Sequence, residues 1–163
     1  MIKALVFDWG DTLMRDFPGY DGPMVYWPKV ELMPDAHTCL KTLSGNYVLC
    51  AASNAGDSDS ILMRKAFERV GINGFLNHAF TSKELGFTKP DVRFFNAIAG
   101  KIGFTPDEIV MIGNDYEKDI KPAKIAGFHT IYYSEIMDQV CNEYADYITN
   151  DIGQLIRIVP QIA

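Results

Sequence analysis

Four groups of polar side chains in this 163-residue chain have the types needed to bind a divalent cation and transfer a phosphoryl group. Carboxylate oxygens hold such a cation, while a hydroxyl and an ammonium contact phosphate oxygens and offset their charge. Each group also has an ordinary structural explanation, because Asp and Gly form turns, Ser bonds nearby backbone and Asp caps helices. The chemical interpretation therefore depends on whether one fold brings the groups together. They are Asp8 with Asp11, Ser53 with Asn54, Lys89, and Asn114 with Asp115 and Asp119.

The strands and helices expected from the hydrophobic pattern would bring these four polar groups together. Strands are predicted at 4–7, 47–52, 78–80, 108–113, 129–133 and 147–148, and helices at 35–43, 58–70, 90–102, 119–126, 135–141 and from 152 onward. Asp57 or Ser58 is expected to cap the second helix, and Asp119 the fourth. Strands that alternate with helices predict a three-layer, doubly wound, Rossmann-like parallel sheet with right-handed crossovers. Such sheets carry their chemistry at the carboxyl ends of the strands, where most of the polar groups fall.

A segment rich in Gly and Pro, residues 14–34, follows the first strand and carries four aromatic side chains, Phe17, Tyr20, Tyr26 and Trp27. Its Pro and Gly content excludes a long helix. We expect an ordered aromatic flap that either covers the edge of the core or faces a substrate. Because no repeat or low-complexity stretch interrupts the pattern, residues 1–163 are expected to form a single domain.

Composition limits the partners and the compartment. A formal net charge of −6 argues against a broad nucleic-acid or anionic-membrane surface, although it permits one locally positive phosphate pocket. No run approaches the roughly 20 apolar residues of a membrane span, and the first apolar run is too short for a secretory leader. The three cysteines have no CxxC spacing, and Cys50 lies in an apolar run, so buried reduced thiols are expected. The sequence therefore predicts a cytoplasmic protein.

Four motifs resemble those of the haloacid dehalogenase-like hydrolase superfamily, in order and spacing and over essentially the whole chain. They are FDWGDTL, CAASN, FTKPDVRFF and GNDYEKDIKPAKIAG. The resemblance implies a HAD-like fold and a Mg²⁺-dependent phosphohydrolase that acts through an aspartyl phosphate on a phosphate ester or an acyl or aryl phosphate. It implies that Asp8 is the nucleophile and a metal ligand, that Ser53 and Asn54 contact phosphate, and that Lys89 stabilises charge. The carbonyl of Gly10 and the fourth motif are implied to complete the metal site.

The chain departs from the family pattern in two places. Family phosphatases carry a second Asp, which acts as general acid and base, where this chain has Gly10, and Asp11 is the candidate substitute. In the fourth motif, Asn114 occupies a ligand position beside Asp115, and Asp119 follows. We favour Asp115 as the metal carboxylate, because an ionised oxygen attracts Mg²⁺ better than an amide oxygen. General acid–base catalysis contributes roughly 10²–10⁴-fold, so its loss predicts an enzyme that is slow on sugar phosphates but competent on acyl or aryl phosphates.

Two other functions remain open. A dehalogenase would share the nucleophile and need neither the second Asp nor a metal, and a phosphate-binding or regulatory module would have lost turnover with the acid at Gly10. The absence of the family's usual cap insertions implies an open site. The resemblance links such a site either to a large phosphorylated substrate or to closure by a second subunit in a homo-oligomer, with a small phosphorylated substrate.

Overall fold

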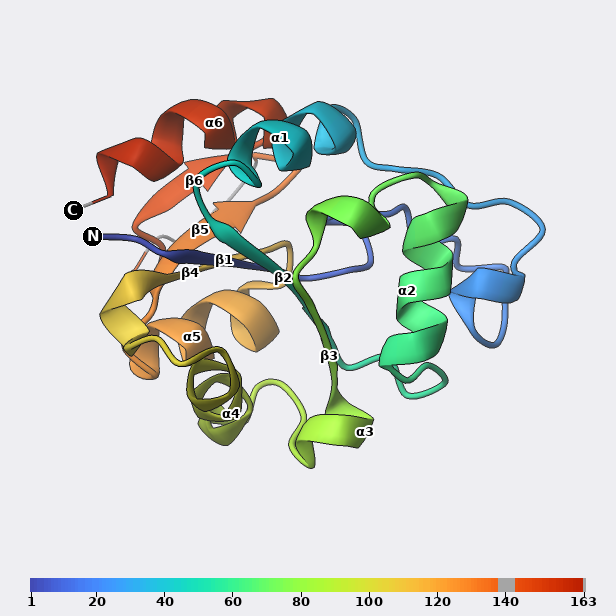
Figure 1. Ribbon diagram of the computed structural model, residues 1–163, viewed down its shortest axis with the longest axis horizontal. Coiled ribbons are helices and arrows are strands. Elements are labelled where there is room, and N and C mark those ends of the chain that lie inside the picture. The colour runs from blue at the N-terminus through green and yellow to red at the C-terminus, as the bar shows by residue number, and fades with distance from the viewer. Residues whose placement is uncertain (138–142, 163) are drawn as a thin grey trace.

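The computed structural model describes residues 1–137 and 143–162, and six strands form its parallel sheet in the order β3-β2-β1-β4-β5-β6 (Figure 1). The strands are β1 (Ala4–Phe7), β2 (Val48–Ser53), β3 (His78–Thr81), β4 (Ile109–Gly113), β5 (His129–Tyr133) and β6 (Tyr147–Thr149). All neighbouring strands pair in parallel. The predicted doubly wound α/β fold is therefore confirmed.

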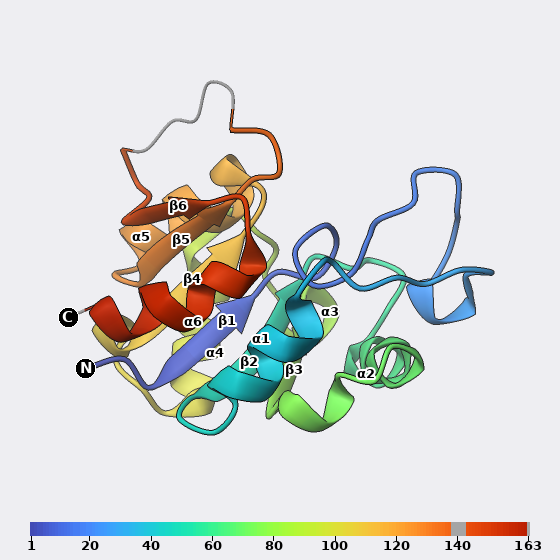
Figure 2. The ribbon, with the colours of Figure 1, turned by 90° about the horizontal axis from the view of Figure 1, so that it is seen from above.

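Helices cover both faces of the sheet (Figures 1 and 2). They are α1 (Ala36–Leu43), α2 (Ser60–Arg69), α3 (Ser82–Leu85), α4 (Val92–Ile102), α5 (Lys121–Ile125) and α6 (Leu155–Ile158). Leu5 and Phe7 of β1 pack in one core layer with α1, α2 and α6, while Ala4 and Val6 pack in the other with α3, α4 and α5. Both faces of β1 are buried because its side chains alternate between two apolar layers, which is why the strand is continuously hydrophobic.

The central position of β1 determines where the site lies. Phe7 at the end of β1 is aligned with Ala51 of β2 on one side and Ile112 of β4 on the other. The backbone N–H of Asp8 then donates to the carbonyl of Ile112 at 2.9 Å. The carboxyl ends of β1, β2 and β4 therefore meet at one edge, at the point where the strand order reverses.

Several helix boundaries differ from the sequence prediction. Helix α2 begins at Ser60, and its cap is Asp59, whose Oδ1 accepts the N–H of Leu62 at 2.9 Å, so the prediction of Asp57 or Ser58 was wrong. Three polar residues in a row could each have capped this helix, and periodicity alone does not choose among them. Helix α4 begins at Val92 behind its cap Asp91, so the predicted start at Pro90 was wrong. It ends before Gly103, as predicted, and this glycine has φ 76°.

The fourth predicted helix has a different start and shape. A five-residue π-helix, Tyr116–Ile120, precedes α5, and its cap is Asp115, whose side chain accepts the N–H of Lys118. The prediction that Asp119 caps this helix was therefore wrong. The predicted helix 135–141 does not form over the described residues 135–137, and residues 138–141 lie outside the described part of the chain.

Three aromatic side chains of the flap contact one another. Phe17, Tyr20 and Trp27 pack ring against ring, with centroids 5.4–6.5 Å apart. Arg69 of α2 donates to the carbonyls of Val25 and Trp27 at 2.9 and 2.7 Å, which holds the flap beside α2 (Figure 2). Between β1 and α1 the only regular element is a 3-10 helix, Met24–Tyr26, in a stretch that the structure describes throughout. No cap domain is inserted in this stretch.

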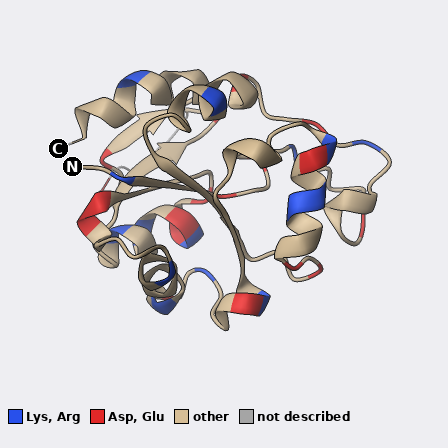
Figure 3. Ribbon diagram, viewed as in Figure 1, with Lys and Arg blue, Asp and Glu red and all other residues tan. Residues whose placement is uncertain are grey.

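Acidic and basic residues are interspersed along the ribbon (Figure 3). Within the described ranges, no helix combines the length and the apolar character that a membrane crossing requires.

Candidate active site

Lys89 forms ion pairs with Asp8 and Asp119 at the centre of the site. Lys89 Nζ lies 2.7 Å from Asp8 Oδ1 and 2.6 Å from Asp119 Oδ1, and it also donates to the carbonyl of Ala52 at 3.3 Å. These three acceptors match the three N–H donors of the ammonium. The Lys89 and Asp119 side chains are 3% and 1% exposed, so both charges depend on each other for compensation.

The charges in this cluster shift one another's titration. Burial alone would lower the pKa of Lys89, but the carboxylates of Asp8 and Asp119 outweigh it, and the pKa is raised. Burial, and then the charge of Asp8, raise the pKa of Asp119, while Lys89 opposes the shift. When both carboxyl groups are ionised, two negative charges around one ammonium leave one negative charge uncompensated. A dianionic phosphate would be repelled there unless a cation joined it.

Asn54 positions Lys89. Its Oδ1 accepts the backbone N–H of Lys89 at 2.7 Å, and its Nδ2 donates to the backbone carbonyl of Lys89 at 2.8 Å. The predicted phosphate contact by the Asn54 side chain therefore stays a prediction, because this amide already holds the lysine backbone. Ser53, the other predicted phosphate contact, lines the same cavity as Asp8 and Lys89.

Asn114 lies beside Asp8, and its position fits a metal ligand. One atom of its amide is 3.0 Å from Asp8 Oδ2 and 3.2 Å from the carbonyl oxygen of Gly10. With nitrogen at this position the amide donates to both oxygens, and turning the amide over puts its oxygen there. Oxygens that share an octahedral Mg²⁺ at 2.0–2.1 Å lie about 2.9 Å apart, so a carboxylate, a carbonyl and an amide oxygen with this spacing fit the ion.

Asp115 and Asp119, the other predicted ligands, have other partners in the structure. Asp115 is 43% exposed at its side chain and caps the π-helix through Lys118 N, at 3.0 Å. Asp119 accepts from Lys89 and from the backbone N–H of Asp115. Among the described residues, no three His, Cys, Asp or Glu side chains are grouped as a metal site. The fit to Mg²⁺ therefore rests on Asp8, the Gly10 carbonyl and Asn114, and metal binding by Asp115 and Asp119 stays a prediction.

The loop after β1 brings a further carboxylate, Asp16, to the site. Asp11, the predicted substitute acid, has φ 55°, and its Oδ1 accepts the backbone N–H of Asp16 at 2.9 Å. Burial raises the pKa of Asp16, as do the nearby charges of Asp11 and Asp8. Sequence reasoning missed Asp16 because it lies in the flap, outside every motif. The only signal in the sequence is the glycine at position 10, which leaves a role unfilled.

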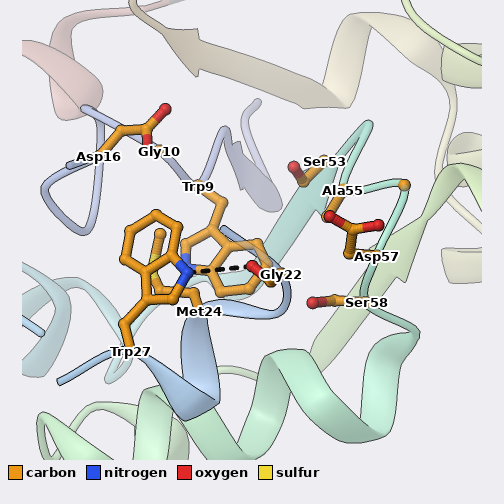
Figure 4. Close-up of a pocket in the computed structure, with 11 residues that line it drawn as sticks. Trp9, Gly10, Asp16, Gly22, Met24, Trp27, Ser53, Ala55, Asp57 and Ser58 are labelled. Atoms are coloured by element: carbon orange, nitrogen blue, oxygen red, sulfur yellow. Dashed lines mark hydrogen bonds between the residues drawn. The ribbon is translucent and has the colours of Figure 1, made fainter. Parts of the chain in front are cut away.

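Two cavities meet at this place. The first, of about 230 Å³, contains Asp8, Lys89, Asn114 and the other predicted site residues. The second, of about 200 Å³, lies under the flap and is lined by Trp9, Met24 and Trp27 (Figure 4). Trp27 Nε1 donates to the carbonyl of Gly22 at 3.0 Å, which fixes the indole over the cavity. The residues that line both cavities are Gly10, Asp16 and Ser53.

Known proteins resemble this chain in sequence and in fold. Over 96 residues it is 36% identical to glyceraldehyde 3-phosphate phosphatase of Methanocaldococcus jannaschii, covering 58% of this chain and 42% of the relative. It is 27% identical to ribulose-1,5-bisphosphate 5-phosphatase of Halopiger xanaduensis over 143 residues, which are 82% of this chain and 59% of the relative. The matched parts are thus less than two thirds of these relatives' own lengths.

The fold is shared with a solved structure of 2-haloacid dehalogenase from Pseudomonas syringae pv. Tomato DC3000. The two superpose with a TM-score of 0.84 at 17% identity and cover each other completely. The family model described as haloacid dehalogenase-like hydrolase matches residues 20–127, more than half of the chain. This match, together with the parallel sheet and the polar residues at its carboxyl edge, shows that the chain belongs to the haloacid dehalogenase-like hydrolases.

Proposed function

We propose that the chain is a Mg²⁺-dependent phosphohydrolase that transfers the phosphoryl group of a phosphate ester, or of an acyl or aryl phosphate, to Asp8 and then to water. The observation that carries the proposal is the ion pair of Asp8 with the buried Lys89, 2.7 Å apart, beside the oxygens of Gly10 and Asn114. Relatives named as phosphatases support the same reaction class.

Each side chain has a distinct task in this reaction. Asp8 supplies the attacking carboxylate oxygen, and Lys89 holds that carboxylate in place while offsetting charge on the phosphoryl oxygens. The hydroxyl of Ser53 can donate to the same oxygens. Asp8, the carbonyl of Gly10 and Asn114 or Asp115 would hold Mg²⁺, which supplies the positive charge that an anionic site needs before it accepts phosphate.

The proposal extends to the size of the substrate, the oligomeric state and the cellular location. The site has no inserted cap between β1 and α1, so it accepts either a small phosphorylated molecule or a phosphate on a larger partner. A homo-oligomer in which a second copy covers the site, and a cytoplasmic location, are parts of the proposal that rest on the sequence.

The test is hydrolysis of p-nitrophenyl phosphate with and without Mg²⁺, by the unsubstituted chain and by Asp8→Asn. We expect turnover that requires Mg²⁺ and a loss of at least about 10³-fold in Asp8→Asn, because the amide is no nucleophile. Asn keeps an oxygen that can accept from Lys89, so thermal unfolding should show that the variant is folded.

The remaining outcomes distinguish the alternatives. Chloride release from a 2-haloacid without Mg²⁺, in the absence of phosphatase activity, would identify a dehalogenase. Retained binding of inorganic phosphate without turnover of any phosphate ester would identify a binding or regulatory module.

A further inference from the structure

We propose that Asp16 is the general acid and base of this site and fills the role left open at Gly10. The inference rests on the proposed phosphohydrolase function. It assigns to one residue of the flap a proton transfer for which the sequence offers only Asp11.

The first observation is the position of Asp16 between the two cavities. A phosphoryl group bound by Asp8, Ser53 and Lys89 occupies one cavity, and the rest of the substrate extends into the one lined by Trp9 and Trp27. The oxygen that joins the two parts must then lie at their boundary. Asp16 is the one acidic residue that lines both cavities in the described part of the chain, so it lies at that boundary. Figure 4 shows it among the residues that line the cavity with Trp9 and Trp27.

The second observation is the space in front of Gly10. A Cβ atom added to Gly10 would lie 3.6 Å from Asp16 Cβ and 3.7 Å from Asp16 Oδ2. A carboxylate carried by residue 10 would therefore extend toward the region that Asp16 already occupies. The glycine keeps the backbone carbonyl, and Asp16 brings a carboxylate to the same side of it.

The third observation is the loop that carries Asp16. The N–H groups of Leu13 and Met14 donate to the carbonyl of Trp9, and Asp11 N donates to the carbonyl of Met14 at 2.6 Å, so the chain turns back on itself. Asp11 Oδ1 then accepts the backbone N–H of Asp16 at 2.9 Å. Asp11 does not line the Trp-containing cavity, and this bond makes it a positioning residue that holds Asp16 over Gly10.

The proton transfers balance in both halves of the reaction. Asp8 forms a bond to phosphorus as the bond to the leaving oxygen breaks, and that oxygen takes its electron pair and the proton of the Asp16 carboxyl group. Asp16, now a carboxylate, accepts a proton from the water that attacks phosphorus. The bond to Asp8 then breaks with its electrons returning to the carboxylate, which releases inorganic phosphate.

The experiment compares p-nitrophenyl phosphate with p-nitrobenzyl phosphate, which carry the same ring on a good and a poor leaving group. In Asp16→Asn we expect kcat/KM for the benzyl ester to fall roughly 10²–10⁴-fold, the range of general acid catalysis, and that for the phenyl ester to change much less. Loss of the base should lower kcat for both esters. With the phenyl ester, whose phosphoryl transfer to Asp8 stays fast, the phosphorylated enzyme should then accumulate, which intact-mass measurement after an acid quench detects.

A double variant tests the position directly. A Cβ atom on Gly10 would meet the Asp16 side chain at ordinary contact distance, and Asp16→Ala removes the atoms that a carboxylate at position 10 would approach. Gly10→Asp with Asp16→Ala should therefore restore at least tenfold of the kcat/KM for the benzyl ester that Asp16→Ala alone loses. Asp107→Asn, which removes an exposed carboxylate before β4 at the opposite end of the sheet, is the matched control and should change neither ester.

Each outcome has one meaning. Equal effects of Asp16→Asn on both kcat/KM values, or no effect, would overturn the inference and leave the phosphohydrolase in place. So would a leaving-group-dependent loss in Asp11→Asn that Asp16→Asn lacks, which would assign the proton transfer to Asp11. Absence of all phosphate hydrolysis by the unsubstituted chain would overturn the proposed function and the inference with it.

Discussion

Lys89 links the chemistry of the site to the stability of the fold. Its ammonium is buried against Asp8 and Asp119, which come from segments far from it and from each other in the sequence. A buried ion pair adds little net stability over an apolar pair, but removing one partner leaves a charge without compensation. Asp8 and Asp119 therefore need Lys89 as their counter-ion, whichever reaction the site performs.

Replacing Lys89 by Met should destabilise the protein markedly. We expect the free energy of unfolding in urea to fall by about 3–5 kcal/mol at neutral pH, because Asp119 would stay buried without its counter-ion. Lys101→Met, which removes an exposed lysine at the end of α4, is the matched control and should stay within about 0.5 kcal/mol of the parent. A loss below 1 kcal/mol in Lys89→Met would contradict this account of the charges.

For single residues, the sequence predicted which side chains form the site better than it predicted the contacts of those side chains. The strand ends predicted that Asp8, Ser53 and Asn114 would lie near Lys89, and the structure brings them together in one cavity. The sequence did not reveal that the Asn54 amide holds the backbone of Lys89, because side-chain direction depends on packing that no motif encodes. Asp16 was not predicted as a site residue for the same reason, because hydrogen bonds within its loop, and not a motif, place it at the site.

In the turn from β4 into the π-helix, the backbone of the chain approaches the Asp119 side chain closely. A Cβ atom on Gly113 would lie only 2.6 Å from Asp119 Cγ, so the strand must end in a residue without a side chain. The π-helix Tyr116–Ile120 then returns Asp119 over this glycine. Such short π-helical turns occur frequently at functional sites.

Gly113→Ala should displace Asp119 and weaken its contact with Lys89. We expect a loss of about 1–3 kcal/mol in the free energy of unfolding, the usual cost of overpacking, together with a lower rate of the proposed hydrolysis of p-nitrophenyl phosphate. Gly100→Ala provides the control, because its Cβ would meet nothing within 4 Å in helix α4. Alanine in a helix should leave that variant as stable as the parent or up to about 1 kcal/mol more stable. Equal stabilities of the two variants would disprove the close-approach argument.

Regular elements were predictable where their pattern was long, and their ends were not. The apolar runs and the 3.6-residue periodicity gave the order of strands and helices, because burial on both faces imposes that pattern. A five-residue π-helix is too short to produce a period, so the sequence suggested an ordinary helix capped by Asp119. The capping residue is in fact Asp115, one of several acidic residues that fit the same rule.

Considered as a whole, the molecule has two core layers that share one sheet, and each layer contains a buried cysteine. Cys39 of α1 lies in the layer with α2 and α6, and Cys50 of β2 lies in the layer with α4 and α5. Burial raises the pKa of both thiols to about 12, with a small contribution at Cys39 from nearby carboxylates. Both thiols are therefore protonated and shielded in the folded protein.

These thiols should report whether the two layers unfold together. In a Cys141→Ser background, we expect iodoacetamide to modify Cys39 and Cys50 slowly and at the same rate at pH 8, because a shared sheet makes unfolding cooperative. Peptide mass spectrometry measures the two rates, and modification in concentrated urea provides the fast reference. Reaction of one cysteine well ahead of the other would show that its layer opens separately.

The place of β1 in the sheet has a consequence for the chain while it is being synthesised. Ala4 to Phe7 pair with both β2 and β4, yet β4 begins only at Ile109. As residues are added at about 5–20 per second, one edge of β1 stays without its partner for several seconds after β2 is complete. For the same interval Asp8 lacks its neighbour Asn114, which follows β4. The nascent chain therefore carries an open strand edge next to an unfinished active site, and both are completed in the same event, when β4 docks.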